Sequence, residues 1–221
     1  MGDLEFFVTE DGEFIVKRDG VTLNSKVLDS KLARRVRECA LICVEMNEVL
    51  YWLEELIKLQ TTHTFDADVR TPDNERYAMT ARSLFTSACV TYFKYFTHGH
   101  GMSIKLVAKK LYDCDQLQTH EAIEEMRHKL IAHIDNSDYL SINLFALKDP
   151  RNPSKTSIVP QIVRTITLLD AKLDSFIELV KLVYKHYANE YNKYCHALMK
   201  NELGAGKFID HQFHSSFSPL S

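Results

Sequence analysis

Residues 127–133, with the sequence Arg-His-Lys-Leu-Ile-Ala-His, combine side-chain types that suit phosphate chemistry. The guanidinium group of Arg127 offers a planar fork of donors for a phosphate, and the imidazole of His133 can exchange protons near neutral pH. RNA carries its own nucleophile, the 2′-hydroxyl group. An arginine and a histidine placed around one phosphodiester would therefore suffice to cut RNA without a metal ion.

Helical geometry decides whether these two side chains meet. On a helix this segment has an apolar stripe made of Ile123, Met126, Leu130 and Ile134. At about 100° per residue, Arg127 lies roughly 55° to one side of the stripe and His133 roughly 65° to the other. One helix therefore keeps them apart, whereas two helices related by a two-fold axis would bring both pairs into one cleft. A homodimer is the hypothesis that completes this site.

The residues between the two ends have simpler interpretations. His128 and Lys129 point away from the apolar stripe and are predicted to face solvent, where Glu124 and Glu125 can pair with them. Considered without any family, an arginine and a histidine at the edge of a buried face usually form an interface salt bridge or a favourable helix C-terminus.

The same residues carry a resemblance to a known family. An arginine, five residues and a histidine on a helix of a small bundle resemble the motif of the HEPN family, the higher eukaryotes and prokaryotes nucleotide-binding domain. The form Arg-x-Lys-x-x-Ala-His, with Asp135 soon after, is similar to bacterial defence and toxin members, as is the stretch 84–92. The resemblance covers about residues 80–140.

Two positions depart from the family pattern. Many members have Asn or Asp directly after the arginine, where this chain has His128. Toxins that are silenced by nucleotidylation have a tyrosine where this chain has Asp135, so that form of control is not predicted.

The resemblance implies a metal-independent endoribonuclease that acts as a homodimer on single-stranded RNA, with Arg127 and His133 as catalytic residues. The 2′-hydroxyl would attack the adjacent phosphate and leave a 2′,3′-cyclic phosphate, while His133 moves a proton and Arg127 holds the developing charge. It also implies a place in phage defence, toxin–antitoxin or stress biology, with an antitoxin or another regulatory protein as partner. The further residues expected to contact RNA are His128, Lys129, Asp135 and Tyr92.

Two other classes of function stay open. One is a non-catalytic HEPN-like module that binds RNA, a nucleotide or a protein partner through the same surface. The other is a helical scaffold that dimerises through its long last helix. The sequence contains no Gly-rich phosphate loop, Gly-x-Ser-x-Gly elbow or paired-carboxylate motif, which leaves other common enzyme classes without support.

Composition indicates a single helical domain. The 221 residues are 45% hydrophobic and 26% charged, and only 7 Gly and 5 Pro interrupt them. A formal charge of −3 does not favour an extended nucleic-acid surface, so any RNA site is expected to be local. The odd number of cysteines, five, and the lack of a leader or of a long apolar run predict a cytoplasmic protein without a membrane span.

The predicted fold is mainly α, a HEPN-like bundle of four to five helices with a short N-terminal β-hairpin and a second small hairpin. Residues 1–28 form a β appendage, residues 29–203 the helical domain, and residues 204–221 a flexible tail. The helices are expected over about 32–57, 72–96, 103–111, 116–133 and 165–202, with the second hairpin at about 138–164.

Thr71, Pro72 and Asp73 predict the start of the second helix. Hairpin turns are predicted at Asp11-Gly12 and Asp19-Gly20. The predicted apolar stripe of the first helix consists of Leu32, Val36, Cys39, Cys43, Met46, Leu50, Leu53 and Ile57, and that of the last helix consists of Ile166, Leu169, Leu173, Phe176, Val180, Val183, Tyr187, Tyr191, Tyr194 and Leu198. The last helix would be roughly 57 Å long, so a kink or a protruding end used for dimerisation is expected.

Other conspicuous side chains have structural interpretations. Cys39 and Cys43 lie on the apolar seam of the first helix and are predicted to be inert core thiols. Tyr92 and Tyr95 could stack on bases, yet core packing explains them more simply. No metal or other cofactor is expected, because no recognised zinc spacing occurs. The histidines weighed as metal ligands and assigned instead to loops are His98, His100 and His120. The basic edge of the short helix, interpreted as solvated, consists of Lys105, Lys109 and Lys110.

Overall fold

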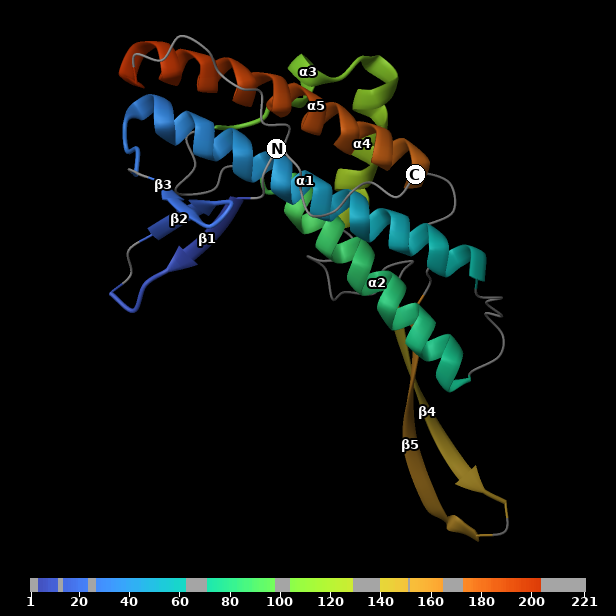
Figure 1. Cartoon of the computed structure of the whole chain (residues 1–221). Coiled ribbons are helices and arrows are strands. Elements are labelled where there is room, and N and C mark those ends of the chain that lie inside the picture. Colours follow the sequence, from blue (N-terminus) through green and yellow to red (C-terminus); the bar gives the residue numbers. More distant parts are fainter. Residues whose placement is uncertain are drawn as a thin grey trace.

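The chain is mainly helical, with two small antiparallel sheets outside the helical body (Figure 1). The structure, a computed structural model, describes residues 4–11, 14–23, 27–62, 71–97, 104–128, 140–150, 152–164 and 173–203. The helices of these ranges are α1 (Lys31–Thr62), α2 (Pro72–Phe93), α3 (Ala108–Leu111), α4 (Cys114–Arg127) and α5 (Leu173–Leu198), which continues into a π-helical segment (Met199–Leu203). The predicted combination of a helical bundle with two β elements is confirmed.

The core lies between the three long helices. α1 packs along α5 on one side and against α2 on another (Figure 1). The predicted stripe of α1 is correct for Cys39, Cys43, Met46 and Leu53, which are buried. Ile42, Val49 and Leu56 are buried as well, although the predicted stripe omits them. A helix with two neighbours buries a wider face than a single stripe, which explains the difference.

Local signals position the starts of α2 and α4. The Thr71 hydroxyl accepts a hydrogen bond from the Asn74 backbone N–H (3.1 Å) ahead of Pro72, as predicted for this helix. α4 begins two residues before the predicted Gln116, because Asp113 and Gln116 form a capping box with bonds of 2.9 and 3.1 Å.

The short helix differs from its prediction. It was expected from Ser103, which lies outside the described residues, whereas α3 begins at Ala108. Leu106 is buried, and its backbone N–H donates to the Tyr95 carbonyl oxygen (2.9 Å). The chain is therefore tied to the end of α2 in a non-helical conformation just where the helix was expected to start.

The last helix confirms its predicted stripe over its described part, since Phe176, Val180, Val183 and Tyr187 are buried. Its predicted first turns, residues 165–172, and the predicted tail, residues 204–221, lie outside the described residues. The described helical segment runs to Leu203, and the predicted stop at Gly204 lies outside the described residues.

The N-terminal sheet has the order β1 (Leu4–Val8), β2 (Phe14–Arg18), β3 (Val21–Leu23). Asp19 and Gly20 have positive φ angles of 51° and 76°, which a tight hairpin between β2 and β3 requires. The predicted Asp-Gly turn is thereby confirmed.

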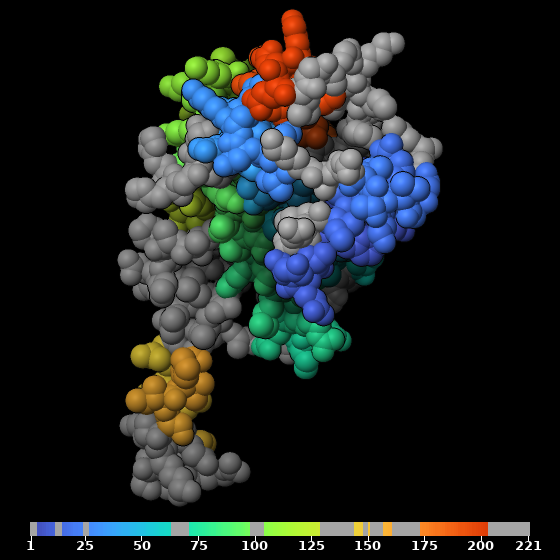
Figure 2. All heavy atoms as spheres, turned by 60° about the vertical axis from the view of Figure 1, so that its left-hand side comes forward, coloured from blue at the N-terminus to red at the C-terminus, as the bar shows by residue number. Residues whose placement is uncertain are grey.

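The second hairpin, predicted at about 138–164, is also confirmed, with β4 (Leu140–Asp149) paired to β5 (Asn152–Arg164). It extends away from the helices as an arm, below the body in Figures 1 and 2. None of the described helices combines the length and the apolar character that a bilayer crossing needs.

Candidate functional site at the end of helix α4

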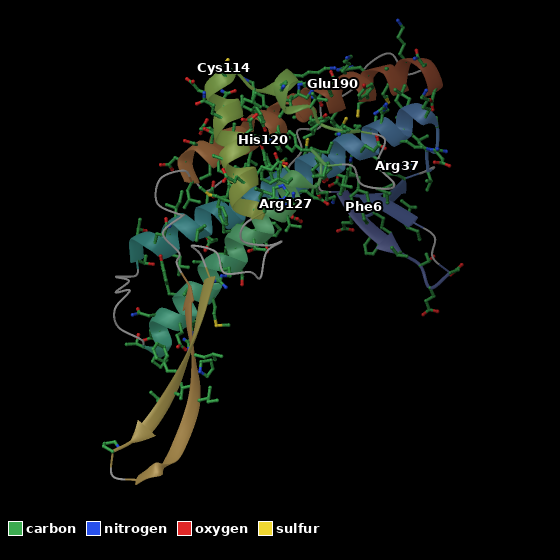
Figure 3. The ribbon with its side chains drawn as sticks, turned by 180° about the vertical axis from the view of Figure 1, so that it is seen from behind. Phe6, Arg37, Cys114, His120, Arg127 and Glu190 are labelled. Atoms are coloured by element: carbon green, nitrogen blue, oxygen red, sulfur yellow. The ribbon has the colours of Figure 1, made fainter. Side chains whose placement is uncertain are left out.

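Arg127 is the last residue of α4 and lies against α2. Its guanidinium carbon is 5.7 Å from the centre of the Phe93 ring, within the range of a cation–π contact. The side chain is half-buried, which agrees with its predicted place on the flank of the apolar stripe. Figure 3 shows Arg127 at one end of α4 and Cys114 at the other, with His120 between them.

The positive charge of Arg127 affects the pKa of Cys89, which lies one turn before Phe93 on α2. Burial raises the pKa of the Cys89 thiol to about 12, and the nearby arginine opposes that rise. Within the part of the chain that the structure describes, no carboxylate forms an ion pair with Arg127. Among the described residues, the contact of the guanidinium is therefore with the Phe93 ring.

Two turns before Arg127, a buried histidine anchors α4 to the core. His120 is the one buried polar residue among those described, and its Nδ1 lies 2.9 Å from the Tyr92 hydroxyl. The Tyr92 and Tyr112 hydroxyls are 2.6 Å apart, and Tyr112 donates to the Leu179 carbonyl oxygen at 3.4 Å. Because the Tyr112 hydroxyl gives its proton to Leu179, it must accept a hydrogen bond from the Tyr92 hydroxyl. The Tyr92 hydroxyl then accepts from His120, which places the proton of the imidazole on Nδ1.

This chain of polar groups joins four elements and is surrounded by rings. It links α4 through His120, α2 through Tyr92, the segment before α4 through Tyr112, and α5 through its backbone. Phe96 lies 4.5 Å from the His120 ring centre, and Phe176 lies 5.0 Å from that of Tyr92. The polar chain therefore fixes where α4, and Arg127 at its end, lies on α2.

Burial sets the protonation of these groups. Desolvation lowers the pKa of His120 to about 4, so the imidazole is neutral at physiological pH. Desolvation also raises the pKa of Tyr92 and Tyr112 well above the usual tyrosine value. The cluster is consequently uncharged and acts as structure, not as an acid or base, near neutral pH.

Two predictions about these residues are wrong. Tyr92 was a candidate for contact with RNA, but it is fully buried and its hydroxyl is bonded inside the core, so its ring is closed to a base. The simpler interpretation of Tyr92 and Tyr95 as core residues is confirmed. His120 was assigned to a loop, but it lies in the middle of α4 and faces the core.

The rest of the motif divides between exposed and undescribed residues. His128 is exposed directly after α4, as predicted, and its backbone N–H donates to the carbonyl oxygens of Glu124 and Glu125. Lys129, His133 and Asp135 lie outside the described residues, as do His98 and His100. The structure thus places Arg127 and His128 and leaves the other three candidate residues of the motif as predictions.

Thiols and metal ligands add no second centre. Cys39, Cys43 and Cys89 are buried free thiols, and burial raises the pKa values of Cys39 and Cys43 to about 11 and 12. The prediction of inert core thiols at Cys39 and Cys43 is confirmed. Among the described residues, no group of three or more His, Cys, Asp or Glu side chains could hold a metal ion.

The polar cluster around His120 was missed from sequence, although one signal was present. His120 and Arg127 are seven residues apart and so fall within about 20° of each other on a helix. A histidine on the same face as a half-buried arginine, one turn before the core residue Ile123, is placed to be buried.

No protein-family model, curated protein or solved structure matches this chain.

Proposed function

We propose that this chain is a metal-independent endoribonuclease that acts as a homodimer, with Arg127 and His133 as its catalytic pair. The proposal extends to a cytoplasmic role in bacterial defence, toxin or stress biology, with RNA as substrate. The HEPN-like motif supplies the chemistry, and the setting of Arg127 is the observation that carries it.

The surroundings of Arg127 suit a phosphate-binding role. A guanidinium held over Phe93 at 5.7 Å is oriented without being neutralised, because an aromatic ring uses the face of the cation and leaves its N–H donors free. The His120 cluster fixes the helix that carries Arg127. A fixed, unneutralised cation is what electrostatic stabilisation of a charged transition state requires.

The reaction needs no cofactor to balance. The 2′-oxygen of RNA forms a bond to the adjacent phosphorus and gives up its proton, while the bond from phosphorus to the 5′-oxygen breaks. The leaving 5′-oxygen takes up a proton. His133 supplies one of these proton transfers, and Arg127 neutralises the charge that grows on the phosphoryl oxygens.

The test uses the full chain and single-stranded RNA in the presence of EDTA. We expect cleavage to a 2′,3′-cyclic phosphate, and no cleavage of DNA of the same sequence because DNA lacks the 2′-hydroxyl. Arg127→Ala and His133→Ala should each abolish cleavage, whereas Arg76→Ala, which removes an exposed arginine from α2, should retain it.

Each contrary result has a distinct meaning. Full activity in His133→Ala, with folding intact, would exclude the proposed mechanism. Retention of RNA without cleavage by the unsubstituted chain would replace the enzyme with a non-catalytic binding module. If the chain neither cleaves nor retains RNA, and disrupting α5 abolishes the dimer, the scaffold function is the one that remains.

A further inference from the structure

The arm formed by β4 and β5 exposes apolar side chains on both of its faces. Leu144 and Phe145 are consecutive and so point to opposite faces. The strand register places Val159 opposite Phe145, and Ile158 on the face of Leu144. Leu144 and Ile158 are 70% and 73% exposed, and Phe145 and Val159 are exposed as well. A two-stranded hairpin with both faces in water is at best marginally stable.

The N-terminal sheet presents a second apolar surface. Leu4, Phe6 and Val8 alternate along β1 and so share one face. The register extends this face through Arg18 of β2 to Val21 of β3, so it is apolar apart from that arginine. These four apolar side chains are exposed, Phe6 to 70%. A sheet with one apolar face normally packs that face against another layer.

The two segments that carry these surfaces have opposite net charge. Residues 4–23 contain five acidic and two basic residues, a net charge of −3. Residues 140–164 contain four basic residues and one acidic residue, a net charge of +3. Segments of opposite net charge that also expose apolar side chains can associate through both hydrophobic burial and electrostatic attraction.

Within one chain the two surfaces lie apart. Each sheet makes its substantial contacts within itself, and the N-terminal sheet and the arm leave the helical body at different places in the two views of Figures 1 and 3. Figure 2 shows the N-terminal sheet as a lobe on one side and the arm below the body. Among their described residues, the two surfaces of one chain therefore share no substantial contact.

We propose that the β4–β5 arm of one copy packs on the apolar face of the N-terminal sheet of a second copy, and reciprocally. The exchange has two-fold symmetry, so it closes at a dimer. Each sheet then covers an apolar face of the other, as stacked sheets do. The contact concerns the sheets and not Arg127. It shares with the proposed function only the requirement that two copies associate, so loss of the sheet contact and loss of RNA cleavage are separate results.

The test measures dimerisation of the full chain by sedimentation velocity over a wide concentration range. One variant changes the arm (Leu144→Ser with Ile158→Ser) and another changes the sheet (Phe6→Ser with Val8→Ser). Each should raise the dimer dissociation constant on the order of tenfold per truncated side chain. The matched control is Met79→Ser with Val90→Ser, which alters two exposed apolar residues of α2 and should leave dimerisation unchanged.

Mixing the two variants identifies the pairing. A copy with a changed sheet keeps an intact arm, and a copy with a changed arm keeps an intact sheet. Together they retain one of the two contacts, so the mixture should form dimers at concentrations where each variant alone is monomeric. Lys148→Glu with Lys155→Glu should likewise weaken the dimer, and Glu10→Lys with Asp11→Lys added in the same chain should restore it.

Other outcomes would overturn the inference. A chain that is monomeric at all concentrations has no partner copy, and its sheets are then covered from within the chain or by another protein. A dimer that neither variant weakens uses a different face, which leaves the ribonuclease proposal intact. A dimer weakened by the arm variant but not by the sheet variant pairs the arm with something other than the N-terminal sheet.

Discussion

The helical body and the two sheets place their apolar side chains in opposite ways. In the body, the core-facing side chains of α1, α2 and α5 are buried against one another, and even the polar groups of His120, Tyr92 and Tyr112 are enclosed and paired. In both sheets large apolar side chains such as Phe6 and Leu144 face water. The free energy of folding therefore resides mainly in the helices, while the sheets hold apolar surface that is available for association.

The largest expected effect is a difference in the free energy of unfolding between substitutions of two phenylalanines, one in the core and one in the arm. Phe176 is 1% exposed and meets the Tyr92 ring edge-on at 5.0 Å, whereas Phe145 of the arm is exposed. Phe176→Ala should lower the free energy of unfolding by about 3–5 kcal/mol through lost burial and a cavity. Phe145→Ala should change it by less than about 0.5 kcal/mol. Denaturant unfolding of dilute protein measures both, and equal losses would show that the arm belongs to the core.

A smaller effect concerns the protonation of His120. Burial puts its folded-state pKa at about 4, below the value of 6.5 for an exposed histidine. As the pH falls from 6.5 towards 4, the unfolded chain binds a proton that the folded chain excludes, so the free energy of unfolding decreases and then levels off below pH 4. The decrease attributable to this group is about 3 kcal/mol.

The measurement compares unfolding of the unsubstituted chain, His120→Phe and His120→Asn at several pH values. Both variants should lose the pH-dependent component, because neither side chain titrates. His120→Asn keeps a donor for Tyr92 and should be the more stable of the two near neutral pH. A pH dependence in His120→Phe as steep as that of the unsubstituted chain would assign it to other groups.

The hydrogen-bonded hydroxyls of Tyr92 and Tyr112 should contribute less to the free energy of unfolding than the protonation of His120 does. Tyr92→Phe removes a hydroxyl that lies 2.9 Å from His120 and 2.6 Å from Tyr112, and leaves two buried polar groups without that partner. The expected loss is about 1–3 kcal/mol. Combining Tyr92→Phe with Tyr112→Phe should cost less than the sum of the two single changes, since both remove the same contact. Additive losses would mean that the two hydroxyls act independently.

Much of this fold could be predicted from local sequence signals. The Asp19-Gly20 turn, the Thr71 cap and the apolar stripe of α5 each follow from a few neighbouring residues, and the structure confirms all three. The flank position of Arg127 follows from helical projection alone. Such features depend on backbone geometry within one element, which a sequence pattern encodes directly.

Features that depend on contacts between elements were not predicted. The burial of His120 requires α2, α4 and α5 to meet, and the late start of α3 requires Leu106 to reach the Tyr95 backbone. The alternation of apolar residues in β1 indicates a face that another layer should cover, but not where that layer comes from. The convergence of Arg127 with His133 is of the same kind, and it stays a prediction about two copies.

The reactivity of the cysteine thiols is expected to show the smallest effect in energy. It reports directly which cysteines lie in the interior and which lie at the surface. Cys114 is exposed at the first turn of α4, whereas the other four cysteines, including Cys89 close to Arg127, are buried. Burial raises the pKa of Cys89 to about 12, so little thiolate forms at mildly alkaline pH. A chromogenic thiol reagent should therefore modify one group at once and the other four only as fast as the chain opens. Cys114→Ser should abolish the fast phase. A second fast thiol that this change does not remove would show that solvent reaches one of the four enclosed cysteines, and its loss in Cys89→Ser would place that solvent near Arg127.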